Sequence, residues 1–218
     1  MPSSDPARLV VMASGSGTNL QAILDACGQT ANRTSVPAGQ HHQAGPARLL
    51  DAEVVLVIAN DSEAYALQRA AAVDVATTVL PHEGRDRTEY DKELAYEASL
   101  AGADLVVLAG WNRLLTSTFL AHHTVINLHP AKPGAFPGLG AIEAAFAAWQ
   151  RGEVTSGGVM VHYVPDEGVD DGPVIAWEEV PLLPGDTLDR FEDRVHQVEH
   201  RLLVESIGTV LAQQWTRT

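Results

Sequence analysis

Short apolar runs alternate with helix-like segments along most of this chain, and this alternation limits the fold more than any other feature. The runs 9–13 and 105–109 are continuously apolar, which is typical of strands buried on both faces of a sheet. Segments between such runs repeat apolar side chains at helical spacing, as Leu20, Ile23 and Leu24 do. Strands alternating with helices predict an α/β domain with a doubly wound, mostly parallel sheet.

The same patterns predict the other elements. The expected strands are 9–13, 54–59, 75–80, 105–109 and 125–128, and the further expected helices are 62–72, 86–100 and 141–151. The rhythm then changes, because the strand-like runs 158–164 and 173–180 follow one another with only a turn between them. We expect these two as antiparallel strands at the C-terminal side of the sheet, followed by a long closing helix over 187–211.

Composition suits one domain. The chain has 218 residues, of which 45% are hydrophobic, so a single domain over 1–218 with a sizeable core is expected. Residues 28–50 are rich in Gly, Ala, Gln and Pro and show no period, which indicates a surface insertion.

Charge and cysteine content exclude several classes of protein. The formal net charge is −14, which argues against general binding to nucleic acid or to an anionic membrane. Backbone N–H groups at a helix start can still hold a small anion. With Cys27 as its one cysteine the chain forms no internal disulfide. It shows no signal-peptide pattern and no apolar run of membrane-spanning length, so a cytoplasmic protein is expected.

A glycine-rich turn, MASGSGTNLQ, joins the first strand to the first helix. Gly15 and Gly17 permit close approach of another group to the backbone, and Thr18 or Asn19 is expected to cap the helix. Free N–H groups at such a helix start favour an anion, most simply a phosphate. The turn is not a P-loop, and Leu20 replaces the third glycine of a dinucleotide fingerprint. An ordinary capped turn is the competing interpretation.

Two polar side chains stand at the end of the fifth strand, in INLHPAKPGAFPGLG. Asn127 and His129 are two residues apart, so on a strand they share a face, at the edge where open parallel sheets bind ligands. Asparagine can donate to a developing oxyanion, and histidine can move a proton near neutral pH. Pro130, Pro133 and Pro137 stiffen the loop that follows. We favour a functional site over a buried, hydrogen-bonded histidine and a turn cap.

An acidic segment, YVPDEGVDDGPVI, lies between the two late strands. Asp166 and Glu167 are interpreted as a solvated turn. Asp170 precedes a constrained Asp-Gly-Pro step, and its carboxylate is a candidate partner that would orient His129 and raise its pKa.

These motifs together resemble the folate-dependent phosphoribosylglycinamide formyltransferase family. SGSGTNLQ, NLHPAKPGAFPG, VHYV and DDGP occur in the family's order and spacing, over about residues 8–205. The resemblance implies a formyltransferase-like fold with a nucleotide-binding half at about 8–110 and a folate-binding half at about 111–210. It implies formyl transfer from 10-formyltetrahydrofolate, as co-substrate, to the amine of glycinamide ribonucleotide in purine biosynthesis. No metal, nucleic acid or membrane is needed, and the protein is expected as a monomer or homodimer.

The resemblance also assigns residues. Asn127, His129 and Asp170 match the catalytic trio. The substrate-binding positions are Gly15, Ser16, Gly17, Thr18, Asn19 and Glu199. The folate-side positions are Arg87, Arg113, Leu114, Leu115, Asn127, Asp166 and Asp170. The chain departs from the family at Ala131–Gly134, a stretch expected to border the folate site.

Other functions compete with this interpretation. HQVEH reads as an inverted zinc-hydrolase motif with His196 and His200 around Glu199. A formyltetrahydrofolate hydrolase would use water as the acceptor, and a formyltransferase for another amine would use a sugar nucleotide. A binding protein that kept the fold without the chemistry is the non-enzymatic alternative, and the intact trio argues against it.

Overall fold

The computed structural model describes residues 5–30 and 49–215. The strands are β1 Ala7–Met12, β2 Ala52–Ala59, β3 Ala76–Val79, β4 Leu105–Leu108, β5 Val125–His129, β6 Ser156–Tyr163 and β7 Val174–Pro181. The helices are α1 Thr18–Ala26, α2 Tyr65–Ala71, α3 Arg87–Leu100, α4 Ser117–Leu120, α5 Ala141–Gln150 and α6 Leu188–Trp215. All the predicted strands and helices are present, with ends shifted by a few residues.

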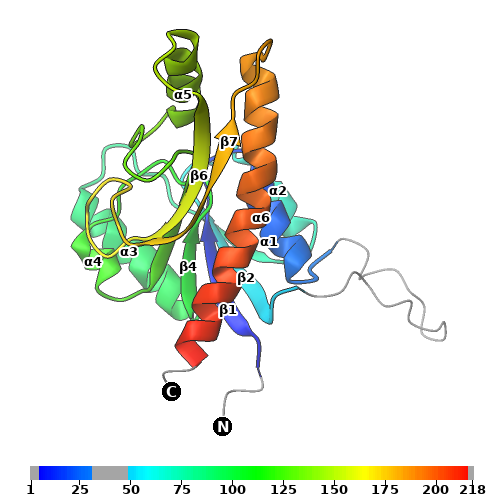
Figure 1. Ribbon diagram of the computed structural model, residues 1–218. Coiled ribbons are helices and arrows are strands. Elements are labelled where there is room, and N and C mark those ends of the chain that lie inside the picture. The colour runs from blue at the N-terminus through cyan, green and yellow to red at the C-terminus, as the bar shows by residue number, and fades with distance from the viewer. Residues whose placement is uncertain (1–4, 31–48, 216–218) are drawn as a thin grey trace, which may run out of the picture.

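The strands form a seven-stranded sheet in the order β3-β2-β1-β4-β5-β6-β7 (Figure 1). The pairs from β3 to β5 are parallel, whereas β6 pairs antiparallel with β5 and β7 pairs antiparallel with β6. The predicted fold class is therefore confirmed, including the late antiparallel pair and the closing helix. The short helix α4 was not predicted. Most of the expected insertion, residues 31–48, lies outside the described residues.

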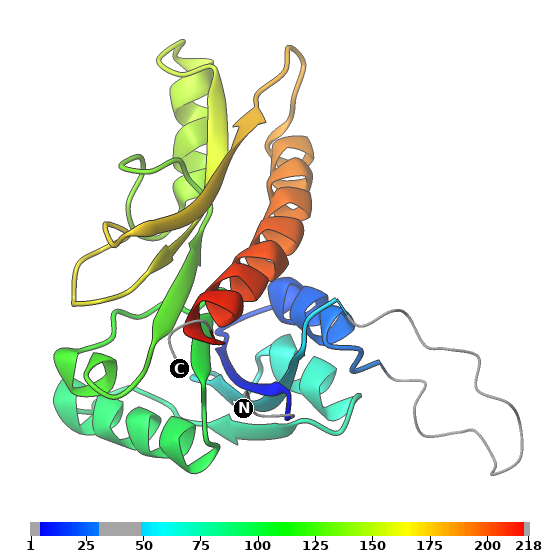
Figure 2. The ribbon, with the colours of Figure 1, turned by 60° about the horizontal axis from the view of Figure 1, so that its bottom comes forward.

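Two apolar clusters lie on the two faces of the sheet. One unites the sheet with α1, α2, α5 and α6, and the other unites it with α3 and α4. Figure 2 shows α6 running across the sheet beside α1. No helix in the described part of the chain is long and apolar enough to cross a membrane.

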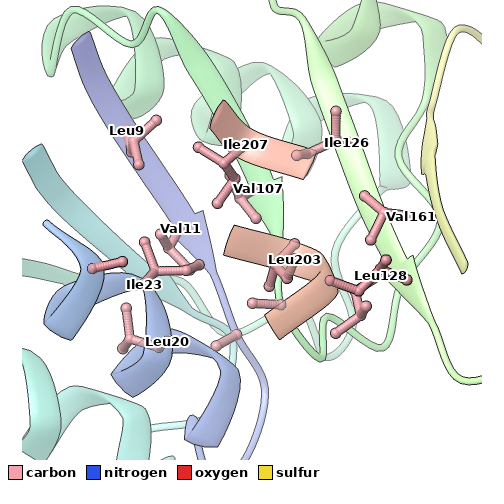
Figure 3. Packing of buried hydrophobic residues seen from close by; sticks show 14 of the residues in the cluster. Leu9, Val11, Leu20, Ile23, Val107, Ile126, Leu128, Val161, Leu203 and Ile207 are labelled. Atoms are coloured by element: carbon pink, nitrogen blue, oxygen red, sulfur yellow. The ribbon is translucent and has the colours of Figure 1, made fainter. Parts of the chain in front are cut away.

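Packing of α6 against the sheet fixes one wall of the site. Leu203 and Ile207 of α6 are fully buried against side chains of β1, β4 and β5, as Figure 3 shows. Burying each such side chain contributes about 1.5–3 kcal/mol. Glu199 lies one turn before Leu203 on the same helix, so this packing holds its carboxylate at the carboxyl end of β1.

Candidate active site

A cavity of about 520 Å³ opens at the carboxyl ends of β1, β4 and β5, and part of α6 lines it. This is the edge where open α/β sheets bind ligands. The predicted site residues that line it are Gly15, Ser16, Gly17, Thr18, Asn19, Arg113, Leu114, Leu115, Asn127, His129, Asp166, Asp170 and Glu199. Arg87 is the predicted site residue that the lining does not include. The fold therefore brings together motifs that are far apart in the sequence.

The proposed catalytic trio meets at one point of this cavity. Asn127 and His129 extend from the same face of β5, as their spacing predicted. The Asp170 carboxylate lies 3.3 Å from Nδ1 of His129, and it accepts a hydrogen bond of 3.0 Å from the amide of Asn127. Asp170 adopts a left-handed backbone conformation, φ 52°, which aspartate tolerates better than most residues.

His162 on β6 is a fourth side chain of this cluster that sequence reasoning missed as a site residue. It lies opposite Asn127 in the β5–β6 register and is buried. Its Nδ1–H donates to the carbonyl of Tyr163 at 2.8 Å, which leaves Nε2 3.2 Å from the Asn127 amide and 3.5 Å from Asp170. The signal in the sequence was a histidine inside the otherwise apolar run of a strand.

The proline-rich loop after β5 folds back onto the trio. Nε2–H of His129 donates to the carbonyl of Phe136 at 3.0 Å, and the N–H of Gly138 donates to Asp170 at 2.8 Å. These contacts link two side chains of the proposed trio, His129 and Asp170, to one segment of backbone. The loop thus orients His129 and Asp170 as well as forming a wall of the cavity.

Lys132, in the stretch that departs from the family pattern, lies outside the cavity lining. Its ammonium group contacts Ser156 and Glu179, each at 2.6 Å. The lysine side chain therefore ties the loop to β6 and β7. None of the residues Ala131–Gly134 belongs to the cavity lining, so the expectation that this stretch borders a folate site stays a prediction.

Asp170 and His129 affect one another's protonation. Burial raises the pKa of Asp170, but hydrogen bonds from His162 and Gly138 and the charge of the histidines bring it below its ordinary value. Burial lowers the pKa of His129 and outweighs the expected rise caused by Asp170 and the Phe136 carbonyl. Both ring nitrogens of His129 face oxygen acceptors, so the charged ring satisfies the hydrogen bonds best. A negative charge that develops in the cavity therefore favours its protonation.

The glycine-rich turn between β1 and α1 also lines the cavity. Gly17 caps α1 in a left-handed conformation, φ 69°, and no side-chain hydrogen bond caps the helix, so the predicted Thr18 or Asn19 cap is wrong. The Asn19 amide instead donates to Glu199 of α6 at 3.2 Å. Uncapped N–H groups at this helix start remain available to an anion. Gly15 has open space around it, so close packing requires glycine only at position 17.

Glu199 is a buried carboxyl group, and its burial raises its pKa despite the Asn19 hydrogen bond and the nearby His196. Because the pKa of Glu199 is raised in the folded state, the protonated carboxyl contributes its full stability below the ordinary pKa of 4.5. This contribution is lost as the pH rises through the folded-state pKa. The charged form at neutral pH thus costs stability.

Replacing Glu199 with glutamine is therefore expected to raise the melting temperature at pH 7, because the amide keeps an acceptor for Asn19 without a buried charge. Thermal unfolding of the ligand-free protein from pH 4 to pH 8 measures this. The gain should shrink towards pH 4, where wild-type Glu199 is protonated. Glu205→Gln, on an exposed part of the same helix, is the control. A Glu199→Gln protein that melts no higher than wild type at pH 7 would contradict this account.

The segment predicted to bind folate, Arg113–Leu115, contributes two leucine side chains and one guanidinium group to the cavity lining. Leu115 is buried and Leu114 is exposed, and both line the cavity. The guanidinium of Arg113 lies over the ring of Tyr90, 4.9 Å from its centroid. Nε of Arg113 is buried with no hydrogen-bond partner within the described chain. An oriented but unsatisfied donor of this kind suits an acceptor atom of a bound ligand.

Arg87 contacts the acidic turn at Glu167, next to the cavity-lining residue Leu114. Arg87 lies 3.5 Å from the carboxylate of Glu167 and 3.5 Å from the carbonyl of Leu114. Glu167 also accepts from the N–H of Ser117 at 3.0 Å. Glu167 is exposed, as predicted, but its contacts attach the acidic turn to the start of α4. Asp166 is exposed too and accepts the N–H of Gly168 at 2.9 Å.

The structure gives the zinc-hydrolase interpretation of HQVEH no support. Among the described residues, no three His, Cys, Asp or Glu side chains are grouped to hold a metal ion. Glu199 of the motif is directed to Asn19, and His196 lies 3.9 Å from Glu192.

Comparisons with known proteins agree with this geometry. A family profile described as formyl transferase matches residues 7–207. The chain is 40% identical to the phosphoribosylglycinamide formyltransferase of Schizosaccharomyces pombe, over 94% of this chain and 97% of that protein. It is 39% identical to the phosphoribosylglycinamide formyltransferase of Dictyostelium discoideum, over 91% of this chain and 95% of that protein. Glycinamide ribonucleotide transformylase 1 from Geobacillus kaustophilus superimposes with a TM-score of 0.78 at 37% identity, covering 94% of this chain and 99% of that one. The chain therefore belongs to the formyl transferase family, among its phosphoribosylglycinamide formyltransferases.

Proposed function

We propose that the protein transfers a formyl group from 10-formyltetrahydrofolate to the amine of glycinamide ribonucleotide, a step of purine biosynthesis. The observation that carries this function is the meeting of Asn127, His129 and Asp170 in a cavity whose lining also includes the uncapped start of α1 and the segment Arg113–Leu115. The helix start suits the phosphate of one substrate, and the leucines with Arg113 suit the ring system of the other. The reaction centre then falls at the trio.

The formyl oxygen is the group that needs stabilisation. When the substrate amine attacks the formyl carbon, the π electrons of the C=O bond move to oxygen and a tetrahedral oxyanion forms. One N–H of the Asn127 amide donates to Asp170, and we assign to the other, which faces Nε2 of His162 in this structure, the role of donating to this oxygen. Nε2–H of His129, which donates to the Phe136 carbonyl in this structure, is the second donor. An oxyanion is a stronger acceptor than that carbonyl and also raises the pKa of His129.

Proton movement completes the transfer. The attacking amine must lose a proton, and N10 of the folate must gain one as its bond to the formyl carbon breaks. Asp170 is ionised, since its pKa is below its ordinary value, and it lies beside His129. We assign Asp170 the role of holding the charged imidazole and of accepting the amine proton, directly or through water.

Substrate placement follows from these two parts of the cavity lining. Ser16 and Gly17 present backbone to the phosphate, and Glu199 faces the remainder of the ribonucleotide. Arg113 and Leu115 provide a donor and an apolar surface for the folate, while Arg87 at the rim serves its outer, anionic part. The two binding halves, the cytoplasmic location and the choice between monomer and homodimer stay predictions.

Acceptor-dependent release of tetrahydrofolate tests this function. Purified protein is mixed with 10-formyltetrahydrofolate with and without glycinamide ribonucleotide, and both products are quantified. We expect release only with the acceptor, in equal amount to the formylated ribonucleotide. Release without the acceptor would instead indicate a hydrolase. Formylation of a sugar-nucleotide amine in preference to glycinamide ribonucleotide would overturn the proposed acceptor.

A further inference from the structure

Helix α2 lies directly behind the glycine-rich turn and contacts it through backbone and side chain. The N–H of Ala66 donates to the carbonyl of Gly15 at 3.2 Å, and Nε of Arg69 donates to the carbonyl of Ser16 at 2.9 Å. A Cβ added to Gly17 would lie 2.7 Å from Cα of Ala66. The turn is therefore held between α2 on one side and the cavity on the other.

These contacts decide which way the turn's N–H groups point. In a trans peptide the C=O and the N–H of the same plane point in opposite directions. With the Gly15 and Ser16 carbonyls directed to α2, the N–H groups of Ser16 and Gly17 face away from α2, on the side of the cavity. No hydrogen bond within the described residues uses either N–H. The α2 contacts thus prepare two free donors for an anion.

Arg69 also places a permanent positive charge behind the turn. Its side chain is half-buried and is held by the Gln21 side chain at 3.2 Å and by the ring of Tyr65, 4.9 Å from the guanidinium carbon. Burial, then the charges of His196 and Arg69, lower the pKa of His200 on α6. The chain has a net charge of −14, so a fixed cation beside the turn offsets the repulsion that a dianionic ligand would meet there.

We propose that Arg69 is a positioning residue for the phosphate of the substrate: it holds the Ser16 carbonyl away from the cavity, so that the turn's N–H groups face the phosphate, and adds positive charge behind them. The proposal rests on the proposed function for the identity of the substrate. Arg69 lies outside the cavity lining, so it acts through the turn rather than by direct contact.

Replacing Arg69 with methionine tests this role, with steady-state kinetics in each substrate. We expect the KM for glycinamide ribonucleotide to rise about 10-fold to 100-fold, as for loss of a charge-assisted hydrogen bond. The kcat and the KM for 10-formyltetrahydrofolate should stay within about threefold, since the trio and the folate wall are untouched. Arg69→Lys keeps the charge with fewer hydrogen-bond donors, so its KM for glycinamide ribonucleotide should lie between those of the wild type and of Arg69→Met. Arg151→Met, at the exposed end of α5, is the matched control.

Some outcomes would overturn the proposal. An unchanged KM for the ribonucleotide in Arg69→Met, or a fall in kcat with unchanged KM, removes the positioning role. An equal rise in both KM values, or a large drop in melting temperature, indicates a purely structural role and overturns it too. Calorimetric titration with inorganic phosphate separates this test from the proposed function. Phosphate binding that Arg69→Met weakens supports the role of Arg69 even if the formyl acceptor is another phosphorylated amine.

Discussion

Replacing His129 with alanine should lower kcat about 100-fold to 10,000-fold, with both KM values changed by less than about fivefold. The imidazole contacts both the Asp170 carboxylate, at 3.3 Å, and the Phe136 carbonyl of the proline-rich loop, at 3.0 Å. In the proposed mechanism its loss removes the charged donor that the developing oxyanion would attract, while the glycine-rich turn and the segment Arg113–Leu115 keep their shape. The effect therefore falls on the transition state.

Rapid-quench measurement of a single turnover, together with steady-state rates, checks this expectation. His122→Ala removes a histidine exposed on the surface after α4 and should leave both rates unchanged. Circular dichroism confirms that the His129→Ala protein is folded. Single-turnover formyl transfer at the wild-type rate in His129→Ala would exclude this histidine from the chemistry.

The fold was largely predictable because its signals are local. Strands buried on both faces must be apolar along their whole length, so runs such as 105–109 stand out without any partner being known. The helix α4 has only four residues, Ser117–Leu120, about one turn, and one turn shows no apolar period. Its position is set by contacts from distant residues instead, such as Glu167 to the N–H of Ser117.

The site was predictable only in part, because several of its contacts join residues that are far apart in the sequence. Asn127 and His129 share a face by strand geometry alone, so their pairing follows from the sequence. The approach of His162 depends on the antiparallel register of β5 and β6, which no local pattern encodes. At the glycine-rich turn a partner 180 residues away, Glu199, takes the Asn19 side chain that local rules assign to a helix cap. Long-range partners override local preferences at these positions.

Replacing Asp170 with asparagine should lower kcat at least about 100-fold. The groups around its two oxygens are donors or rings that can donate: the Asn127 amide at 3.0 Å, the Gly138 N–H at 2.8 Å, and the two histidines. An asparagine must turn its NH₂ towards one of these donors, and it removes the negative charge that favours protonated His129. Asparagine tolerates the left-handed backbone, so the loop itself should persist.

Asp171→Asn is the matched control, because it changes the neighbouring, exposed carboxylate and should keep kcat within about twofold. Rates for both variants are measured at saturating substrates from pH 5 to pH 9. The Asp170→Asn loss should be largest at high pH, because the pKa of His129 falls further without the carboxylate beside it. A loss of the same size in Asp171→Asn would trace the effect to the loop and not to the carboxylate that touches His129.

Combining His129→Ala with Asp170→Asn distinguishes a single catalytic unit from two independent groups. If Asp170 works mainly by holding and charging His129, its substitution has little left to remove once the imidazole is gone. The double variant should then be about as slow as the slower single variant. Losses that multiply would instead show that Asp170 takes the amine proton without His129. Because the carboxylate lies 3.3 Å from Nδ1 of His129, we assign its main effect to the charge on the imidazole, with uptake of the amine proton depending on His129 as well, and we expect the first result.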